Sequence, residues 1–213
     1  MSAVDPNQCR LYGILDLSYV AETDVASVAE QMIDGGIDVI QLRAKGRSIP
    51  EVATIAQALN QITRRRNIPL VINDHAEIAR SIFASGVHVG QNDSPISSVR
   101  EIVGAKSMVG KSTHSVDQAI RAVDEGADYI GFGPIFATPT KPDYIPIGLD
   151  EIQKVHQAVR LPVFCIGGIK LDNLSDVIAA GAQRVVIVSA LLQAKDIASY
   201  ARSAKQLLAQ AKI

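Results

Sequence analysis

The chain has 213 residues, of which 47% are hydrophobic and 20% are charged, and its formal net charge is -1. A chain of this length and hydrophobic content can bury a substantial core, and it suits one domain of moderate size or two small ones. Nucleic acids and anionic membranes usually select basic surfaces, so the near-neutral charge argues against either as the main partner. It favours a small neutral or anionic ligand.

Targeting signals and cysteine motifs are missing from the sequence. Residues 1–6 have neither the basic region nor the apolar core of a signal peptide, and no apolar stretch is long enough to cross a bilayer. The two cysteines, Cys9 and Cys165, lack metal-ligand spacing, so we expect free thiols in a reducing compartment. We therefore expect a soluble cytoplasmic protein.

Short β-branched runs alternate with longer amphipathic stretches eight times along the chain. Each run predicts a strand, and each stretch predicts the helix that follows it. The predicted strands are residues 11–15, 39–43, 69–73, 86–89, 108–112, 129–133, 163–166 and 184–188.

Start and stop signals support several of the predicted helices. Ser48 and Ser115 are each followed three residues later by Glu or Gln, which is the pattern of a capping box. Gly35, Gly126 and Gly181 lie where three other amphipathic stretches end. These signals place the starts and ends of the predicted helices between the predicted strands.

Eight strand–helix units of this length, without a linker rich in Pro, Gly or Ser, predict an α/β fold, a single (β/α)₈ TIM barrel spanning residues 1–213. We expect residues 1–9 to be a flexible N-terminal segment. The alternative is an open doubly wound sheet. That fold usually has a Gly-rich turn after its first strand, and Leu-Asp-Leu-Ser at residues 15–18 is not such a turn.

Two aspartates, Asp74 and Asp93, come just after the third and fourth predicted strands. The active site of a barrel lies at the C-terminal ends of its strands. Magnesium takes one or two protein carboxylates and leaves its other positions to water and phosphate oxygens, so the pair indicates a metal site for a phosphorylated ligand. The alternative is that each aspartate only starts the following helix, where acidic residues are common.

The second predicted strand has one polar face, formed by Gln41, Arg43 and Lys45. This face must point into the mouth of the barrel. An arginine and a lysine are costly to bury without an anionic partner, so they either pair with the nearby aspartates or bind a ligand. A purely structural cluster of ion pairs is the alternative.

The segment after the sixth predicted strand is unusually long, and it contains Thr138, Thr140 and Lys141. Connections of this length are commonly lids or binding loops. The two hydroxyls and the ammonium group are suitable donors to phosphate oxygens. A surface loop stiffened by prolines is the alternative interpretation.

Two short turns follow the last two predicted strands, one with Gly167 and Gly168 and the other with Val188 and Ser189. Barrels frequently bind a phosphate with these two loops. Glycine allows a close approach of the backbone, and exposed N–H groups at a helix start bind anions. Together the turns predict a phosphate site.

These blocks, taken together, resemble the thiamine phosphate synthase family, also called thiamine-phosphate pyrophosphorylase. The resemblance covers nearly the whole chain and rests on residues 41–45, 72–74, 88–93, 112–114, 131–141, 166–169 and 188–190. It implies a (β/α)₈ barrel and a transferase that uses magnesium. The implied reaction joins 4-amino-2-methyl-5-hydroxymethylpyrimidine diphosphate to 4-methyl-5-(2-phosphoethyl)thiazole, giving thiamine phosphate and diphosphate.

The resemblance also implies roles for individual residues, which fall into three groups. The first group binds magnesium and the diphosphate: Asp74 and Asp93 hold the metal, and Arg43, Lys45, Asn73 and Lys141 bind the oxygens. The second lines the pyrimidine pocket and comprises Gln41, His88 and Ser112. The third meets the thiazole phosphate and comprises Thr138, Thr140, Gly168, Val188 and Ser189. Of these, Arg43, Lys45, Lys141 and Ser112 are the expected catalytic residues.

The implied reaction is dissociative, because diphosphate leaves first and the thiazole nitrogen captures the pyrimidine cation. Such a reaction needs the leaving group to be stabilised and the substrates to be aligned more than it needs an acid or a base. The expected partners are the two small molecules, and a homodimer is plausible by family analogy. His75 and Lys111 receive no role from the sequence.

Three other functions are compatible with the same barrel. The sister family of thiazole tautomerases keeps the phosphate site but lacks the complete metal and diphosphate set. A phosphosugar aldolase would use Lys45 or Lys141 as a Schiff base. A regulatory barrel would bind thiamine phosphate without turnover.

Overall fold

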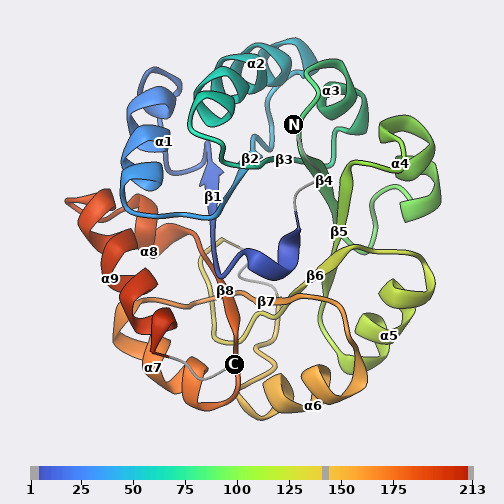
Figure 1. The fold of residues 1–213 in the computed structure, drawn as a ribbon, viewed down its shortest axis with the longest axis vertical. Helices are drawn as coiled ribbons and strands as arrows, with labels where there is room; N and C mark the ends of the chain where they lie inside the picture. The colour runs from blue at the N-terminus through green and yellow to red at the C-terminus, as the bar shows by residue number, and fades with distance from the viewer. Residues whose placement is uncertain (1–4, 141–143, 211–213) are drawn as a thin grey trace.

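The computed structural model describes residues 5–140 and 144–210, which form a closed barrel of eight parallel strands inside a ring of helices (Figure 1). The strands follow one another around the barrel in chain order, and β8 pairs with β1. The predicted (β/α)₈ TIM barrel is therefore confirmed, and the open doubly wound sheet is wrong.

Each predicted strand agrees with an observed strand to within one residue at either end. The strands are β1 (Leu11–Asp16), β2 (Val39–Arg43), β3 (Leu70–Asn73), β4 (Gly86–Val89), β5 (Met108–Thr113), β6 (Tyr129–Phe132), β7 (Val163–Cys165) and β8 (Arg184–Ile187). The helices are η1 (Pro6–Gln8), η2 (Glu22–Asp24), α1 (Val25–Asp34), α2 (Ile49–Arg65), α3 (Ala76–Ser81), α4 (Ile96–Val103), α5 (Val116–Asp124), α6 (Asp150–Ala158), α7 (Leu171–Ala179), α8 (Ser189–Leu192) and α9 (Ile197–Ala209).

The two predicted capping boxes differ in the structure. At the start of α2, Ser48 and Glu51 form the complete box, with the Ser48 N–H donating to Glu51 Oε2 over 2.8 Å. At the start of α5, Ser115 Oγ accepts from the Gln118 N–H, but Gln118 Oε1 accepts from the His114 N–H instead of the Ser115 N–H. Each arrangement satisfies N–H groups that the first turn of a helix leaves unpaired.

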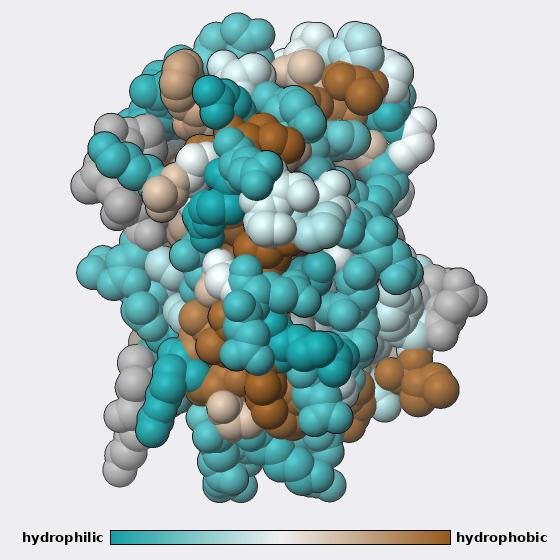
Figure 2. Space-filling view, turned by 90° about the vertical axis from the view of Figure 1, so that its right-hand side faces the viewer, coloured by the Kyte–Doolittle hydropathy of each residue, from teal (hydrophilic) through white to brown (hydrophobic). Residues whose placement is uncertain are grey.

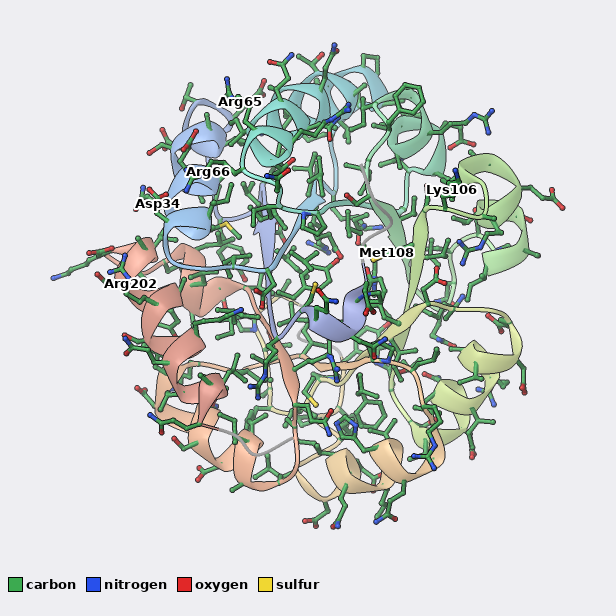
Figure 3. The ribbon with its side chains drawn as sticks, in the orientation of Figure 1. Asp34, Arg65, Arg66, Lys106, Met108 and Arg202 are labelled. Carbon is green, nitrogen blue, oxygen red and sulfur yellow. The ribbon has the colours of Figure 1, made fainter. Side chains whose placement is uncertain are left out.

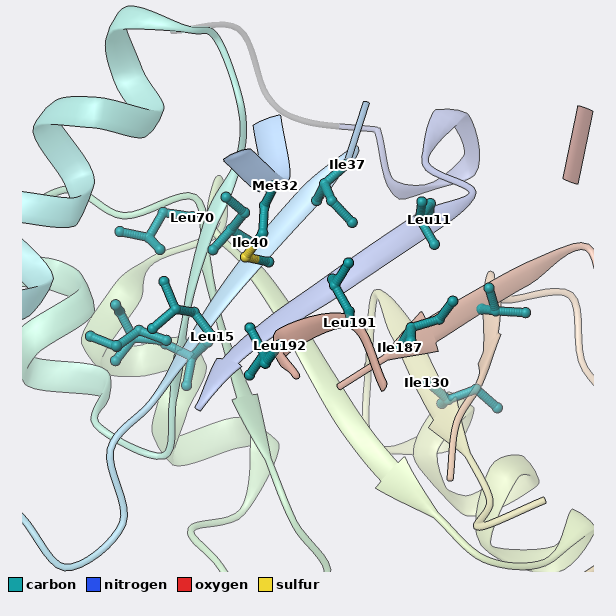
Figure 4. Packing of buried hydrophobic residues seen from close by; sticks show 14 of the residues in the cluster. Leu11, Leu15, Met32, Ile37, Ile40, Leu70, Ile130, Ile187, Leu191 and Leu192 are labelled. Carbon is teal, nitrogen blue, oxygen red and sulfur yellow. The ribbon is translucent and has the colours of Figure 1, made fainter. Parts of the chain in front are cut away.

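Two apolar layers hold the barrel together. One lies between strands and helices, and Figure 4 shows part of it, where Leu15 and Ile40 from the strands pack near Met32 of α1 and Leu192 of α8. The other fills the inside of the barrel and consists of Cys9, Tyr12, Ile14, Val39, Val71, Met108, Tyr129, Phe164 and Val186. Because successive residues of a strand point to opposite faces, every strand except β4 contributes to both layers.

The N-terminal end of the barrel is closed by η1, which lies over the middle of the ring (Figure 1). Part of the segment that we expected to be flexible is therefore folded: residues 6–8 form this helix, and Arg184 donates to the Asn7 carbonyl over 3.0 Å. Cys9 and Cys165 are buried free thiols, and burial raises their pKa values to about 11 and about 12. Both are therefore thiols near neutral pH.

Exposed ion pairs and exposed apolar side chains lie on the outer surface. Figure 3 shows Arg66 beside Asp34, where the two side chains join α2 to α1 over 2.6 Å, and such exposed pairs contribute about 0–1 kcal/mol. Figure 2 shows the side that carries α4 and α5, where Ile120 and Val123 are 42% and 40% exposed. None of the helices in the described part of the chain has the length and apolar character needed to span a membrane.

Partly exposed carboxylates attach neighbouring strands to each other at the N-terminal end of the barrel. Asp38, just before β2, accepts from the N–H groups of Arg10 and Leu11 at the start of β1 over 2.8 and 2.9 Å. Asp128, just before β6, accepts in the same way from the Val109 N–H in β5 over 2.7 Å. These contacts satisfy strand-end N–H groups that have no ladder partner.

Asp128→Ala should lower the free energy of unfolding by about 1.5 kcal/mol, because it leaves the Val109 N–H without its acceptor and removes one of the acceptors of the Arg100 guanidinium. Chemical denaturation measures the change. Asp124→Ala is the matched control on the same side of the barrel, since Asp124 is exposed, and it should change stability by less than about 0.5 kcal/mol. An equal effect of both substitutions would contradict the structural role of Asp128.

Candidate active site

An open cavity lies at the C-terminal ends of the strands. The space within it and at its open mouth is about 840 Å³. Ten of the residues that the sequence predicts for the site line it: Gln41, Arg43, Asn73, His88, Ser112, Thr138, Thr140, Gly168, Val188 and Ser189. Lys141 lies outside the described residues.

The polar face of β2 meets carboxylates, as the sequence allowed, but the partner of Arg43 is a different one. Arg43 Nη1 pairs with Asp16 Oδ2 over 2.6 Å, and Asp16 is fully buried. Asp16 ends β1 and lies directly opposite Arg43 in the register of the two strands. A second contact comes from the Ser18 N–H, which donates to Asp16 Oδ1 over 2.9 Å. The pair fixes the guanidinium in the cavity wall.

The two aspartates that were predicted as metal ligands lie together beside the cavity. Asp74 directly follows β3, and its N–H donates to the His88 carbonyl of β4 over 2.9 Å. Burial raises the pKa of Asp74, a hydrogen bond from Lys45 opposes this, and the neighbouring Asp93 carboxyl raises the pKa further. Asp74 also has a left-handed backbone with φ of 66°, which is uncommon outside glycine and asparagine. The fold thus holds two mutually repelling carboxylates next to each other.

This carboxylate pair suits a divalent cation. In the parts of the chain that the structure describes, no group of three or more His, Cys, Asp and Glu residues could hold a metal. A cation at Asp74 and Asp93 would therefore take two ligands from the chain and the rest from water or a ligand. That is the usual habit of magnesium, and a cation would relieve the repulsion between the two carboxylates.

Lys45 completes the rim through an ion pair with Asp74. Its side chain is 53% exposed, so the ammonium group is reachable from the solvent. Opposite it, the Gly90 N–H donates to Asp93 Oδ2 over 2.7 Å and orients that carboxylate. The rim therefore offers one exposed cation and two carboxylates that hydrogen bonds orient.

The base of the cavity is a set of amide, imidazole and hydroxyl groups. His88 Nε2 and Ser112 Oγ are 2.9 Å apart, and Gln41 Nε2 donates to Asn73 Oδ1 over 3.2 Å. These four side chains come from β2, β3, β4 and β5, and Gln41 is only 3% exposed. A planar polar ligand in this place would meet donors and acceptors at fixed positions.

The segment after β6 packs on the turn after β7. The Ile135 N–H donates to the Ile166 carbonyl and the Phe136 N–H to the Gly167 carbonyl, over 2.8 and 3.0 Å. A Cβ on Gly168 would lie 2.6 Å from the Ala137 carbonyl oxygen, and its φ is 65°. The double glycine is therefore needed for contact between the two loops, in addition to any ligand.

Among the cavity-lining residues that received no individual role from the sequence are Asp16, His114 and Tyr144. Asp16 had a usable signal, because it is a charged residue at the end of the first predicted strand. His114 Nδ1 hydrogen-bonds to the Gly133 carbonyl, and its ring centroid lies 4.6 Å from that of Tyr144. Tyr144 had no signal, since its position depends on the path of the loop.

The two residues without a sequence-based role lie away from the cavity lining. Lys111 points outward from β5 and is 5% exposed, with its Nζ 3.9 Å from Glu125 Oε2. His75 directly precedes α3 and makes no side-chain cap hydrogen bond.

Comparison with known proteins gives a consistent result. Residues 11–191 match the family model described as thiamine monophosphate synthase. The chain is similar to a protein named thiamine-phosphate synthase from Chloroflexus aurantiacus, with 42% identity over 200 residues, 93% of this chain and 92% of that protein. A protein of the same name from Shouchella clausii is 41% identical over 189 residues, 88% and 90% of the two chains. The solved structure of thiamine phosphate pyrophosphorylase from Pyrococcus furiosus matches with a TM-score of 0.89 and 30% identity, covering 97% of this chain and 98% of that one.

Asp16→Asn should lower the free energy of unfolding by about 3 kcal/mol, because it leaves the Arg43 guanidinium without its buried carboxylate partner. Chemical denaturation without ligands measures the change. Asp176→Asn is the control, since Asp176 is exposed on α7 and the substitution removes the same charge. If the two variants unfold at the same denaturant concentration, the Asp16–Arg43 pair does not stabilise the barrel.

Proposed function

Because the chain belongs to the thiamine monophosphate synthase family, it is a transferase of thiamine biosynthesis, and we propose how its cavity performs the reaction. The substrates are 4-amino-2-methyl-5-hydroxymethylpyrimidine diphosphate and 4-methyl-5-(2-phosphoethyl)thiazole. The products are thiamine phosphate and diphosphate. The contact between Asp74 and Asp93 beside the cavity carries the proposal, since two adjacent carboxylates suit a magnesium ion that accompanies a diphosphate.

The diphosphate lies at the rim, between the carboxylates of Asp74 and Asp93 and the cations Arg43, which ends β2, and Lys45, which follows it. When bound, magnesium neutralises the diphosphate and so makes it a better leaving group. Lys45 is paired with Asp74 and exposed, so it can turn from that carboxylate to a phosphate oxygen. Arg43 and Asn73 line the wall beside it and donate N–H groups to the other oxygens. The family resemblance assigns Lys141, which lies outside the described residues, to the same group of donors.

The thiazole phosphate lies at the opposite side of the cavity. Thr138 and Thr140 supply hydroxyl groups from the loop, and Thr140 Oγ1 already lies 3.0 Å from the Tyr19 hydroxyl. The Gly168 backbone and the turn of Val188 and Ser189 supply N–H groups and a hydroxyl. Two separate sets of donors on one barrel mouth fit two anionic substrates.

The pyrimidine lies between these two sites, over Gln41, His88 and Ser112. Its reacting methylene then faces the thiazole nitrogen, and the walls of the cavity exclude water from the cation that forms when diphosphate leaves. Alignment of this kind replaces a chance encounter of two substrates in solution and accounts for much of the expected acceleration. Proton transfer by a side chain is not required.

The decisive experiment is to incubate the purified chain with both substrates, with and without magnesium, and to measure thiamine phosphate. We expect product only when the metal is present. Conversion of a thiazole carboxylate phosphate without synthesis would support the tautomerase alternative. Borohydride trapping of a lysine would indicate an aldolase, and tight binding of thiamine phosphate without turnover would indicate a sensor.

Asp93→Ala should lower kcat about 100- to 1,000-fold, the size of loss seen when one electrostatic contact of a transition state is removed. Binding of the thiazole phosphate, measured by calorimetry, should change little, because Asp93 lies at the other site. Asp176→Ala is the control and should leave both quantities unchanged, since Asp176 is exposed on α7. Equal losses of turnover and of thiazole phosphate binding would mean that Asp93 is structural.

A cytoplasmic location and a homodimer stay predictions. Sedimentation of the purified chain measures the second directly, and it should give about twice the 22.7 kDa of one chain.

A further inference from the structure

Two buried tyrosines lie beneath the cavity and connect residues that line it. Tyr12 of β1 and Tyr129 of β6 are 3% and 2% exposed, and neither lines the cavity. Their strands are not neighbours in the barrel, so the two side chains meet across its interior.

The hydroxyl groups of these tyrosines form one continuous hydrogen-bond chain with the base of the cavity. Tyr12 Oη lies 2.8 Å from Gln41 Oε1 and 3.1 Å from Tyr129 Oη. Tyr129 Oη lies 3.2 Å from His88 Nδ1, and His88 Nε2 lies 2.9 Å from Ser112 Oγ. The chain thus begins at Gln41 and ends at Ser112, both of which line the cavity.

The direction of this chain follows from the number of protons. An amide oxygen only accepts, so Tyr12 donates its one hydroxyl proton to Gln41. Tyr12 must then accept from Tyr129, and Tyr129 in turn must accept from His88 Nδ1–H. In neutral His88 the other nitrogen, Nε2, has no proton and accepts from Ser112. Burial raises the pKa of both tyrosines, so both hydroxyls keep their protons near neutral pH.

This direction determines what the base of the cavity presents to a ligand. Ser112 donates its only hydroxyl proton to His88 Nε2. Its Oγ can therefore only accept a hydrogen bond from the ligand. Gln41 has its oxygen turned to Tyr12, so its amide nitrogen faces the cavity side, where one N–H donates to Asn73. An acceptor and a donor at these positions complement the exocyclic amine and a ring nitrogen of a 4-aminopyrimidine.

The packing around Tyr12 and Tyr129 holds the hydrogen-bond chain in place. The Phe164 ring contacts both phenol rings edge to face, with centroids 5.4 Å from Tyr12 and 5.5 Å from Tyr129. Gly110 leaves the room for the contact with His88, because a Cβ there would lie 2.1 Å from Tyr129 Cζ and 2.6 Å from His88 Nδ1. Distances under 3.0 Å do not occur for real Cβ atoms, so residue 110 must be glycine if the two rings are to meet.

We propose that Tyr12 and Tyr129 are positioning residues that determine the polarity of the pyrimidine pocket. They hold His88 as the Nδ1–H tautomer and keep the Gln41 oxygen turned inward, so that Ser112 accepts from an aminopyrimidine and Gln41 donates to it. The assignment of this ligand rests on the proposed function. The tautomer of His88 does not, and it is measured without substrates.

The first test is the tautomer of His88 in the free protein. Long-range ¹H–¹⁵N correlation spectra of protein labelled at histidine nitrogens distinguish the two tautomers, and His88→Gln identifies the signal among the four histidines. At about pH 8, above the ordinary histidine pKa of about 6.5, we expect the Nδ1–H form. An Nε2–H form, or an imidazolium at that pH, would overturn the proposal and leave the synthase assay unaffected.

The second test is the pair of variants Tyr12→Phe and Tyr129→Phe, which keep the rings and remove the hydroxyls. Each should turn the His88 signal into a mixture of tautomers and raise KM for the pyrimidine diphosphate about tenfold, while KM for the thiazole phosphate stays unchanged. Tyr200→Phe is the matched control, because it removes a hydroxyl that accepts from the Leu171 N–H on the outer layer, over 2.9 Å. It should change none of these quantities.

Two results of the variants would overturn the proposal. One is a His88 tautomer and a KM for the pyrimidine diphosphate that neither tyrosine variant changes. The other is an equal rise of KM for both substrates, which indicates a general loss of structure. If one variant does not fold, the other still tests the hydrogen-bond chain, because each variant removes one of the two hydroxyl groups that connect Gln41 to His88.

Discussion

The pairing of β8 with β1 is the constraint on which the rest of the structure depends. Closure of a parallel sheet brings the C-terminal ends of all its strands to one rim, so residues far apart in the sequence meet around one cavity. It also divides each strand into inward and outward positions. Asp16, Gln41, Arg43 and Ser112 all owe their place to inward parity at the end of a strand, whereas Lys111 on the same strand as Ser112 is turned to the helices.

Closure also brings cations and carboxylates together in a partly buried mouth, where unpaired charges would be costly. Two ion pairs of different exposure neutralise these charges. Arg43 is held by the fully buried Asp16, so its guanidinium stays in position whether or not a ligand is present. Lys45 is more exposed, and its partner Asp74 also faces Asp93. An ion pair of the second kind is easily exchanged, because solvent screens it and an anionic ligand with its cation can replace both contacts. One cation is thus fixed, and the other is free to respond to a substrate.

Much of this arrangement could be read from the sequence, because hydrophobic periodicity marks strands and parity marks their faces. The eight strands, the polar face of β2 and the position of Asp74 and Asp93 after β3 and β4 all came from local patterns. The rest depends on three-dimensional relations that no local pattern contains. The partner of Arg43 follows from the register of β1 against β2, and the folding of η1 over the barrel follows from contacts such as that between Arg184 and Asn7. Tyr144 reaches the cavity only through the path of a long loop.

The contact between Tyr12 and Tyr129 is the clearest case of such a relation, since it joins strands on different sides of the barrel. In the sequence each is simply an aromatic residue of an apolar strand. A buried polar group is costly unless its hydrogen bonds are satisfied. The hydroxyl groups of Tyr12 and Tyr129 each donate one hydrogen bond and accept one. Replacing either tyrosine by phenylalanine would leave a neighbour unsatisfied, so the two hydroxyls belong to one network with Gln41 and His88. The selectivity of the cavity therefore depends on a layer of the core that no ligand touches.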